Sequence, residues 1–293
     1  MIVASLITYW QAIVLGVVQG VTELFPVSSL GTSVILPKLL GWNIHQNDAY
    51  FLAFLVAVHL ATALVLLGFF WKDWVRVVNG IGRSLRDREI APADADAKLG
   101  WLLVVGTIPA GILGLLLEHP LRKVFASPTS AAIFIFINGL LLFAFEELRK
   151  RAPGAPETER DEDNRIAQRV SWNQAAGVGA AQALALIPGI SRSGVTMGGG
   201  LLVGLNNEDA AKFAFMLATP IIGAAALLKI PDLLGHTGNG VRGQALVAAL
   251  CAALTAYLSV RYLMRFFETN RLTPFAIYCT AIGAMLTIGF VLT

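Results

Sequence analysis

Two stretches of the sequence decide the fold: QGVTELFPVSSLGT at Gln19–Thr32 and QALALIPGISRSGVT at Gln182–Thr196. Each lies inside a long apolar run and contains one charged side chain, Glu23 in the first stretch and Arg192 in the second. Each also contains proline, glycine and a pair of serines, residues that interrupt a helix or begin one. An ionisable side chain at membrane depth is costly, so it indicates a functional site and an oppositely charged partner. We therefore expect Glu23 and Arg192 to form the two halves of one site.

The composition around these stretches is that of a membrane protein. The chain has 293 residues, of which 56% are hydrophobic and 14% charged, and its mean hydropathy is +0.68. Soluble domains carry about 25% charged residues. Several runs without Lys, Arg, Asp or Glu approach the length of about 20 helical residues that a hydrocarbon core requires. The sequence therefore predicts an all-α polytopic membrane protein.

The two halves of the sequence repeat. A shift of 163 positions places Gln19 on Gln182, Ser28 on Ser191 and Gly31 on Gly194. Each half then consists of a broken helical hairpin and three spans, and because three is an odd number the second half is expected to be inverted. Non-helical backbone at this depth must be buried in protein or line a wet cavity, which fits a re-entrant hairpin; the alternative is a single span with a break. The expected first repeat covers 1–148, with its hairpin at 2–40 and spans at 49–70, 99–117 and 130–148. A cytoplasmic linker is expected at 149–169. The expected inverted repeat covers 170–293, with its hairpin at 170–205 and spans at 213–228, 244–260 and 272–293.

Basic residues are distributed unevenly between the two sides of this topology. One side carries sixteen Lys and Arg and the other five, so the positive-inside tendency makes the first side cytoplasmic. Both termini then face outward, and the two hairpin tips meet near mid-membrane. The net charge of +3 follows from these short basic segments, so no nucleic-acid partner is expected. The cytoplasmic segments are 71–98, 149–169, 206–212 and 261–271, and the outer ones are 38–48, 118–129 and 229–242.

Two cytoplasmic segments are expected to lack regular structure. Segment 71–98 contains six basic residues and is interpreted as a loop. Segment 149–169 has mixed charge and two prolines and is interpreted as an exposed linker. The acidic residues of Asp161–Asp163 and Glu208–Asp209 are likewise expected to be solvated.

The second stretch offers an anion site. Pro188 ends one helix, and the next helix begins near the serines with unpaired N–H groups, where anions bind. Arg192 adds a planar fork that suits phosphate oxygens. Gln19 and Glu23 are four residues apart and share a helix face. Beside a phosphate, Glu23 is useful as a base or as a ligand of a divalent cation, so these parts predict phosphoryl chemistry on a lipid.

At these residues the chain resembles the bacterial undecaprenyl-diphosphate phosphatases, also called bacitracin-resistance proteins. The resemblance covers essentially the whole chain and is most specific in QGVTELFPVSS and PGISRSGVT. It implies an enzyme of the bacterial cytoplasmic (inner) membrane that removes the terminal phosphate of undecaprenyl diphosphate, which recycles the carrier lipid for cell-wall synthesis. It also implies a site open to the outer face and a divalent cation, Mg²⁺ or Ca²⁺, with Glu23 as a candidate ligand. The expected partners are the lipid substrate and the bilayer, and a homodimer is a further expectation.

The residues that match the family's motifs receive expected roles. Ser29 is expected to attack the terminal phosphorus with Glu23 as its base, or to position a water molecule that attacks instead. Arg192 is expected to stabilise charge on the phosphoryl oxygens. Two positions depart from the family's pattern, because many members have Glu at Gln19 and members commonly have His at Thr32. The expected catalytic residues are Glu23, Ser29 and Arg192, and the expected substrate-binding residues are Gln19, Ser28, Thr32, Gly189, Ser191, Ser193, Gly194 and Thr196.

Three alternatives stay open. In the first, Glu23 and Arg192 form a buried ion pair with a structural role alone. In the second, the chain is a transporter or flippase that grips a lipid phosphate, since inverted repeats with broken helices are transporter architecture. In the third, suggested by Thr32, the chain binds the lipid without turnover. His59 lies in an apolar helix and is expected to pack or hydrogen-bond within the bundle rather than to replace the absent His.

Overall fold

The structure, a computed structural model, describes residues 7–44, 49–125, 127–150, 162–235 and 240–292. These residues form helices joined by loops and turns, with no β-strand among them. Six of the described helices are long and apolar enough to cross a membrane. The chain is therefore an all-α multi-pass membrane protein, as the sequence predicts. Parts of the expected first hairpin (2–6), the linker (151–161) and the last span (293) lie outside the described residues.

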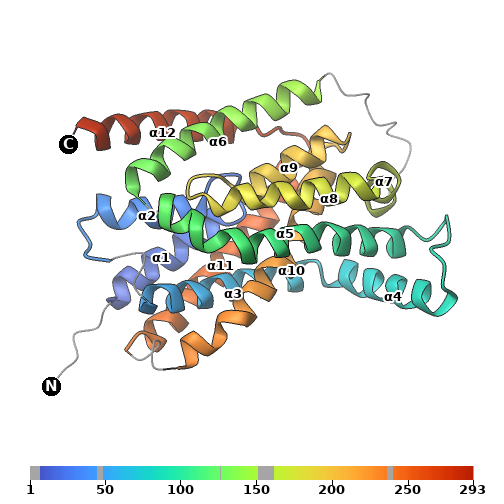
Figure 1. The fold of residues 1–293 in the computed structure, drawn as a ribbon, viewed down its shortest axis with the longest axis horizontal. Helices are drawn as coiled ribbons and strands as arrows, with labels where there is room; N and C mark the ends of the chain where they lie inside the picture. Colours follow the sequence, from blue (N-terminus) through green and yellow to red (C-terminus); the bar gives the residue numbers. More distant parts are fainter. Residues whose placement is uncertain (1–6, 45–48, 126, 151–161, 236–239, 293) are drawn as a thin grey trace.

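Two broken helical segments and six long helices make up most of the molecule (Figure 1). The first broken segment consists of α1 (Tyr9–Thr22) and α2 (Ser29–Leu39). The second consists of α8 (Trp172–Ala181), a 3₁₀ turn η1 (Gln182–Leu186) and α9 (Arg192–Leu202). The long helices are α3 (Ala49–Phe69), α5 (Ala95–Phe125), α6 (Pro128–Arg149), α10 (Asn207–Leu234), α11 (Arg242–Phe267) and α12 (Thr273–Leu292), and two further helices are α4 (Trp71–Asp87) and α7 (Glu162–Arg169).

Both broken segments begin with the same capping arrangement. Thr8 accepts a hydrogen bond from the backbone of Gln11, and the Gln11 side chain accepts one from the backbone of Thr8. Ser171 and Gln174, which lie 163 positions later, repeat this capping box at the start of α8. Such boxes satisfy two N–H groups that lack partners at a helix start. The local chemistry at the two helix starts is therefore the same.

Helices pack in reciprocal pairs across the two halves of the chain. α1 packs against α11 and α8 against α5, while α3 faces α10 and α6 lies beside α12 along one edge of the molecule (Figure 1). Small residues allow close approach: a Cβ on Gly179 would lie 1.9 Å from the Gly106 carbonyl oxygen, and one on Gly16 would lie 2.4 Å from that of Ala248. Such contacts are typical of membrane bundles. This pairing is the arrangement expected of two halves related by a twofold axis, a relation that stays a prediction.

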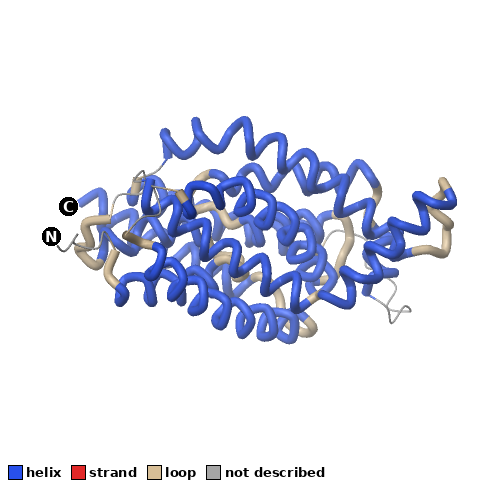
Figure 2. Tube along the Cα trace, turned by 90° about the horizontal axis from the view of Figure 1, so that it is seen from below, coloured by secondary structure: helices blue, strands red, loops and turns tan. Residues whose placement is uncertain are grey.

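The long helices run along the same general direction in both views (Figures 1 and 2). Figure 1 shows α1 beginning and α12 ending at the left end of the molecule, whereas α4 and α7 lie at the right end. The two ends of the molecule therefore differ. The start of α1 and the end of α12 lie at one end, and α4 and α7, which belong to the basic segments, lie at the other.

Segment 71–98 is not a loop throughout, which corrects the expectation from sequence. Trp71–Asp87 forms α4, whose Val77 and Gly80 are buried and which packs against α5. Its basic side chains, including Arg83 and Arg86, are exposed. Apolar and basic residues recur here with a helical period, and the basic side chains lie on the exposed face of an amphipathic helix.

The linker ends in a helix that contributes a buried carboxylate, so the expectation that Asp163 and Asp209 are solvated is wrong. Asp163 of α7 is 1% exposed and forms ion pairs with Arg76 of α4 and, at 3.0 Å, with Lys212 of α10. Asp209 is 2% exposed and pairs with Arg165 of α7 at 2.7 Å. Burial raises the pKa of the Asp163 carboxyl above its ordinary value, and the two cations oppose this shift. Carboxylates can be buried here because cations on neighbouring elements neutralise them.

We expect Asp163→Ala to destabilise the fold by about 3 kcal/mol, because the buried Lys212 then loses a partner. Thermal unfolding of the purified protein in detergent measures the effect. Arg86→Ala is the matched control, since the ion pair of Arg86 with Asp87 is exposed and should leave the unfolding midpoint unchanged. Equal midpoints for Asp163→Ala and the wild type would contradict this role of α7.

Candidate active site

The tips of the two broken segments meet inside the molecule. Gly189 N–H donates to Ser28 Oγ at 3.1 Å, and Ser193 Oγ donates to the Phe25 carbonyl at 2.9 Å. The backbones touch as well, because a Cβ on Gly31 would lie 2.8 Å from Gly189 N. Gly189 has a φ of +112°, a conformation that favours glycine. The two stretches that decide the fold therefore form one structural unit.

The second helix of each segment begins with a buried serine. Ser28 caps α2 by accepting from Gly31 N at 3.1 Å, and Ser191 caps α9 by accepting from Gly194 N at 3.2 Å. These hydroxyls satisfy N–H groups that have no partner within the helix. Ser28 and Ser191 are each 2% exposed. Their contacts are those of structural caps, and their expected contact with substrate stays a prediction.

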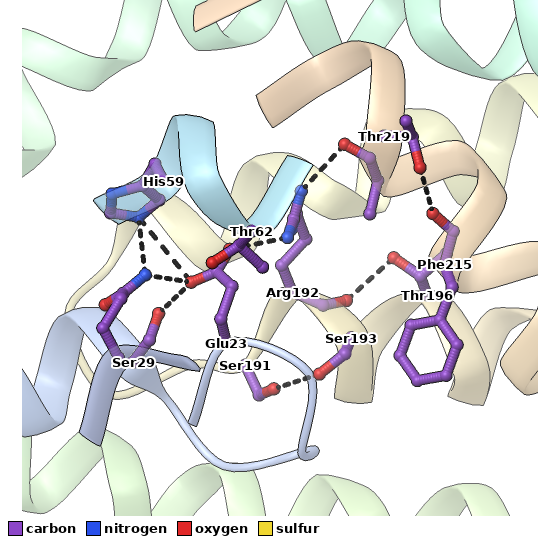
Figure 3. Close-up of polar contacts among 12 residues, drawn as sticks. Glu23, Ser29, His59, Thr62, Ser191, Arg192, Ser193, Thr196, Phe215 and Thr219 are labelled. Atoms are coloured by element: carbon purple, nitrogen blue, oxygen red, sulfur yellow. Dashed lines mark hydrogen bonds and ion pairs between the residues drawn. The ribbon is translucent and has the colours of Figure 1, made fainter. Parts of the chain in front are cut away.

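Glu23 lies at the centre of the polar contacts (Figure 3). Its Oε1 accepts from Arg192 Nη2 at 2.7 Å. Its Oε2 accepts from Ser29 Oγ at 2.5 Å and from Gln19 Nε2 at 2.9 Å. The Glu23 side chain is 7% exposed, so the guanidinium neutralises a buried carboxylate. The expected meeting of Glu23 and Arg192 is thus present, although 169 positions separate them.

Arg192 retains hydrogen-bond donors for a ligand. One terminal nitrogen bonds Glu23, and the other lies 3.4 Å from the Ala218 carbonyl of α10, which is a long and weak bond. The guanidinium carries five N–H donors in a planar fork that matches phosphate geometry. Its side chain is 15% exposed. Arg192 can therefore hold Glu23 and a phosphate at the same time.

His59 of α3 also lies at the site, although the sequence assigns it only to packing or hydrogen bonding within the bundle (Figure 3). Its Nδ1 lies 2.8 Å from the Leu55 carbonyl, and because a carbonyl only accepts, Nδ1 carries the proton. Its Nε2 lies 3.2 Å from Gln19 Nε2, an amide donor, and 3.6 Å from Glu23 Oε2. The Nε2 lone pair therefore accepts from the Gln19 amide, and the ring lies beside the carboxylate on a side chain that is 30% exposed.

Asn138 of α6 is a residue that sequence reasoning did not single out. It is 1% exposed and lies against both tips. Its Nδ2 donates to the Pro26 carbonyl at 3.1 Å, and its Oδ1 accepts from Ser191 N at 3.0 Å. The one signal in the sequence is a polar side chain within an apolar span.

The two predicted threonines bond within their own helices. Thr32 Oγ1 donates to the Ser28 carbonyl at 2.7 Å, and Thr196 Oγ1 donates to the Arg192 carbonyl at 2.8 Å. Thr196 is 1% exposed, whereas Thr32 is partly exposed. Each hydroxyl proton is therefore used by the backbone, and a role in substrate binding stays a prediction for both residues.

The donor set for a divalent cation is small. Among the described residues no group of three or more His, Cys, Asp or Glu could hold a metal ion. Glu23 supplies a carboxylate, and the buried Gln19 Oε1 accepts no hydrogen bond from any described residue. These oxygens fit a cation that takes its other ligands from phosphates and water, as Mg²⁺ does.

The fold and the site together define a multi-pass membrane protein in which Glu23, Arg192, Ser29 and His59 form a polar cluster between two broken helical segments. The family model described as "Bacitracin resistance protein BacA" matches residues 12–285, and the chain belongs to this family. It is 49% identical to proteins named undecaprenyl-diphosphatase from Mycolicibacterium paratuberculosis and Mycobacterium avium, over 94% of this chain and 95% of each relative. It is 43% identical to the "Undecaprenyl-diphosphatase 2" of Frankia alni, over 97% of this chain and 98% of the relative. The family resemblance predicted from sequence is confirmed.

Proposed function

We infer that the chain is an undecaprenyl-diphosphatase, which hydrolyses undecaprenyl diphosphate to undecaprenyl phosphate and inorganic phosphate. The observation that carries this inference is the contact of Glu23 with both Arg192 and Ser29. These residues supply the groups that phosphoryl transfer requires: Glu23 a base, Arg192 a phosphate-binding guanidinium and Ser29 a hydroxyl nucleophile. The names of the relatives support hydrolysis over the transporter alternative.

The terminal phosphate of the substrate is proposed to bind at the start of α9. Arg192 supplies N–H donors and a positive charge there. The first-turn N–H groups of α9 that Ser191 does not cap have no acceptor within the helix, and they favour an anion. The lipid tail then stays in the hydrocarbon, while the reacting phosphorus lies between Arg192 and Ser29.

Ser29 is proposed to be the nucleophile. Ser29 Oγ donates a hydrogen bond to Glu23 Oε2, with 2.5 Å between the two oxygens. Glu23 therefore accepts the hydroxyl proton as Ser29 Oγ bonds to the terminal phosphorus. The bond from that phosphorus to the bridging oxygen breaks, and its electron pair leaves with undecaprenyl phosphate. Arg192 stabilises the charge on the equatorial oxygens throughout.

His59 is proposed to serve the second step, in place of the His that Thr32 replaces. Its Nε2 accepts a proton from water as the water oxygen bonds to phosphorus. The bond from phosphorus to Ser29 Oγ breaks, Glu23 returns its proton to Ser29, and His59 releases the proton taken from water to the solvent. In the alternative with a water nucleophile, Ser29 only positions the water and no phosphoserine forms.

A divalent cation is proposed to bind with the substrate. Glu23 and Gln19 Oε1 would hold it beside the diphosphate, where it would supply positive charge to the phosphate oxygens. The reason for proposing the cation is electrostatic, because the Glu23 carboxylate and the diphosphate are both negatively charged and repel each other unless a cation offsets their charge.

The site is proposed to open to the outer face of the bacterial inner membrane. Sixteen of the basic residues lie in the segments assigned to the cytoplasmic side, against five in the outer segments. The helices α4 and α7 belong to the segments assigned to the cytoplasmic side, and the start of α1 lies at the opposite end of the molecule (Figure 1). The α1–α2 segment is therefore proposed to enter the membrane from the outer side.

Glu23→Ala and Arg192→Ala are each expected to lower phosphate release from undecaprenyl diphosphate by about 100-fold or more, because each removes a group that the transition state needs. The release is measured on purified protein in detergent, after thermal unfolding has shown that each variant is folded.

The double variant Glu23→Gln/Arg192→Gln separates this role from a purely structural ion pair. It removes both charges together, so it leaves no unpaired buried ion and should fold better than either single variant. We expect it to remain inactive. Near-normal release from the double variant, or from either single one, would contradict the catalytic assignment.

A phosphoserine at Ser29 is the expected intermediate. With substrate labelled in the terminal phosphate, rapid quenching should show transient label on the protein, and His59→Gln should accumulate more of it because the second step loses its base. Ser29→Ala is the control without an acceptor and should carry no label. If neither the wild type nor His59→Gln becomes labelled, the water nucleophile is the correct mechanism.

Removal of divalent cations is expected to stop phosphate release. EDTA should abolish it, and Mg²⁺ or Ca²⁺ in excess should restore it, because the cation offsets the repulsion between Glu23 and the diphosphate. Full activity in EDTA would show that Arg192 neutralises the substrate without a metal ion.

A further inference from the structure

Asn138 joins the two hairpin tips through a single amide group. Its Nδ2 donates to the carbonyl of Pro26 in the first tip at 3.1 Å, and its Oδ1 accepts from Ser191 N in the second tip at 3.0 Å. Nδ2 also lies 3.5 Å from the sulfur of Cys279 in α12, which itself lies 3.8 Å from the Pro26 carbonyl. The side chain belongs to α6 and is 1% exposed. One residue outside both hairpins therefore bonds to the backbone of each.

The two backbone groups that Asn138 satisfies lie where helices are interrupted. Pro26 lies between α1 and α2, and Ser191 is the residue before α9. Backbone groups at membrane depth have no water to bond, so they require a partner within the protein. An apolar side chain at position 138 would remove the amide partner of both groups at once. α6 also packs directly against the second tip, because a Cβ on Gly189 would lie 2.5 Å from the Ala131 carbonyl oxygen.

The bonds of Asn138 act very close to the reacting groups. Pro26 lies three residues after Glu23 and three before Ser29, and Ser191 directly precedes Arg192. A shift of one tip against the other would change the distance of 2.7 Å from Glu23 to Arg192, which spans the two tips. A misplacement of about 1 Å can lower a rate by about 100-fold even when the changed residue is far from the chemistry.

We propose that Asn138 is a positioning residue for phosphate release. It holds the two tips in register, so that Glu23, Ser29 and Arg192 reach one phosphate. Its hydrogen bonds go to the backbone of the tips and not to these three side chains, so it acts through the backbone and not on the substrate. The proposal rests on the proposed function of the Glu23–Arg192 site.

Three variants of the full chain test the proposal. Asn138→Leu keeps the approximate size of the side chain and removes both bonds. Asn138→Asp keeps an acceptor for Ser191 N and is the conservative variant. Thr280→Val is the matched control, because Thr280 lies on α12 against Gly139 and its hydroxyl donates to the Ala276 carbonyl of its own helix.

The readout is kcat and KM for phosphate release, expressed per folded molecule as measured by thermal unfolding and gel filtration in detergent. We expect Asn138→Leu to lower kcat by about 10- to 100-fold and to change KM by less than about threefold. Asn138→Asp should retain more of kcat than Asn138→Leu, and Thr280→Val should retain the wild-type value. A purely structural role would reduce the amount of folded protein without changing kcat per folded molecule.

Each other outcome overturns the proposal. Wild-type kcat per folded molecule in Asn138→Leu would place Asn138 in the core alone, and so would an equal loss in Thr280→Val. If Asn138→Leu does not fold, the comparison passes to Asn138→Ala, which also removes both hydrogen bonds, and an unchanged kcat there is the negative result. A wild type that releases no phosphate would instead overturn the proposed function, and this inference with it.

Discussion

The ion pair between Glu23 and Arg192 is the constraint on which the rest of the structure depends. An unpaired charge at membrane depth costs several kcal/mol or shifts to its neutral form, so neither residue is stable there without the other. The two lie on different broken segments, and their contact requires both tips to reach the same point. The hydrogen bond of Gly189 to Ser28 and the backbone contact with Gly31 make this approach possible. The reciprocal helix pairs then enclose the tips.

Sequence predicts the parts of the site that carry a local signal. A lone charge in an apolar run, beside proline and paired serines, is visible without any coordinates, and it identifies both Glu23 and Arg192. The long apolar runs predict spans for the same reason. The expected span at 99–117 is shorter than α5 (Ala95–Phe125), because the end turns of a membrane helix reach the wet interface and need no apolar side chains.

Other features depend on distances that a sequence pattern does not contain. His59 and Asn138 are single polar residues in apolar helices, and nothing near them in sequence points to Glu23 or to the tips. Asp163 looks like a solvated charge until α4 and α10 bring Arg76 and Lys212 to it. The many basic residues of α4 similarly lead to its interpretation as a loop, although its apolar residues follow a helical period. In each case a tertiary contact, and not the local sequence, determines the environment.

The long separation between Glu23 and Arg192 has a consequence for biosynthesis. The two residues are 169 positions apart. At a synthesis rate of about 5–20 residues per second, Glu23 leaves the ribosome roughly 10–30 s before Arg192 does. During this interval the Glu23 carboxylate has no guanidinium to neutralise it, so placing it at its final depth costs free energy. We therefore expect the first segment to reach its final position in the bilayer only after the second half is translated, so that the contact of Glu23 with Arg192 forms late in the synthesis of the chain.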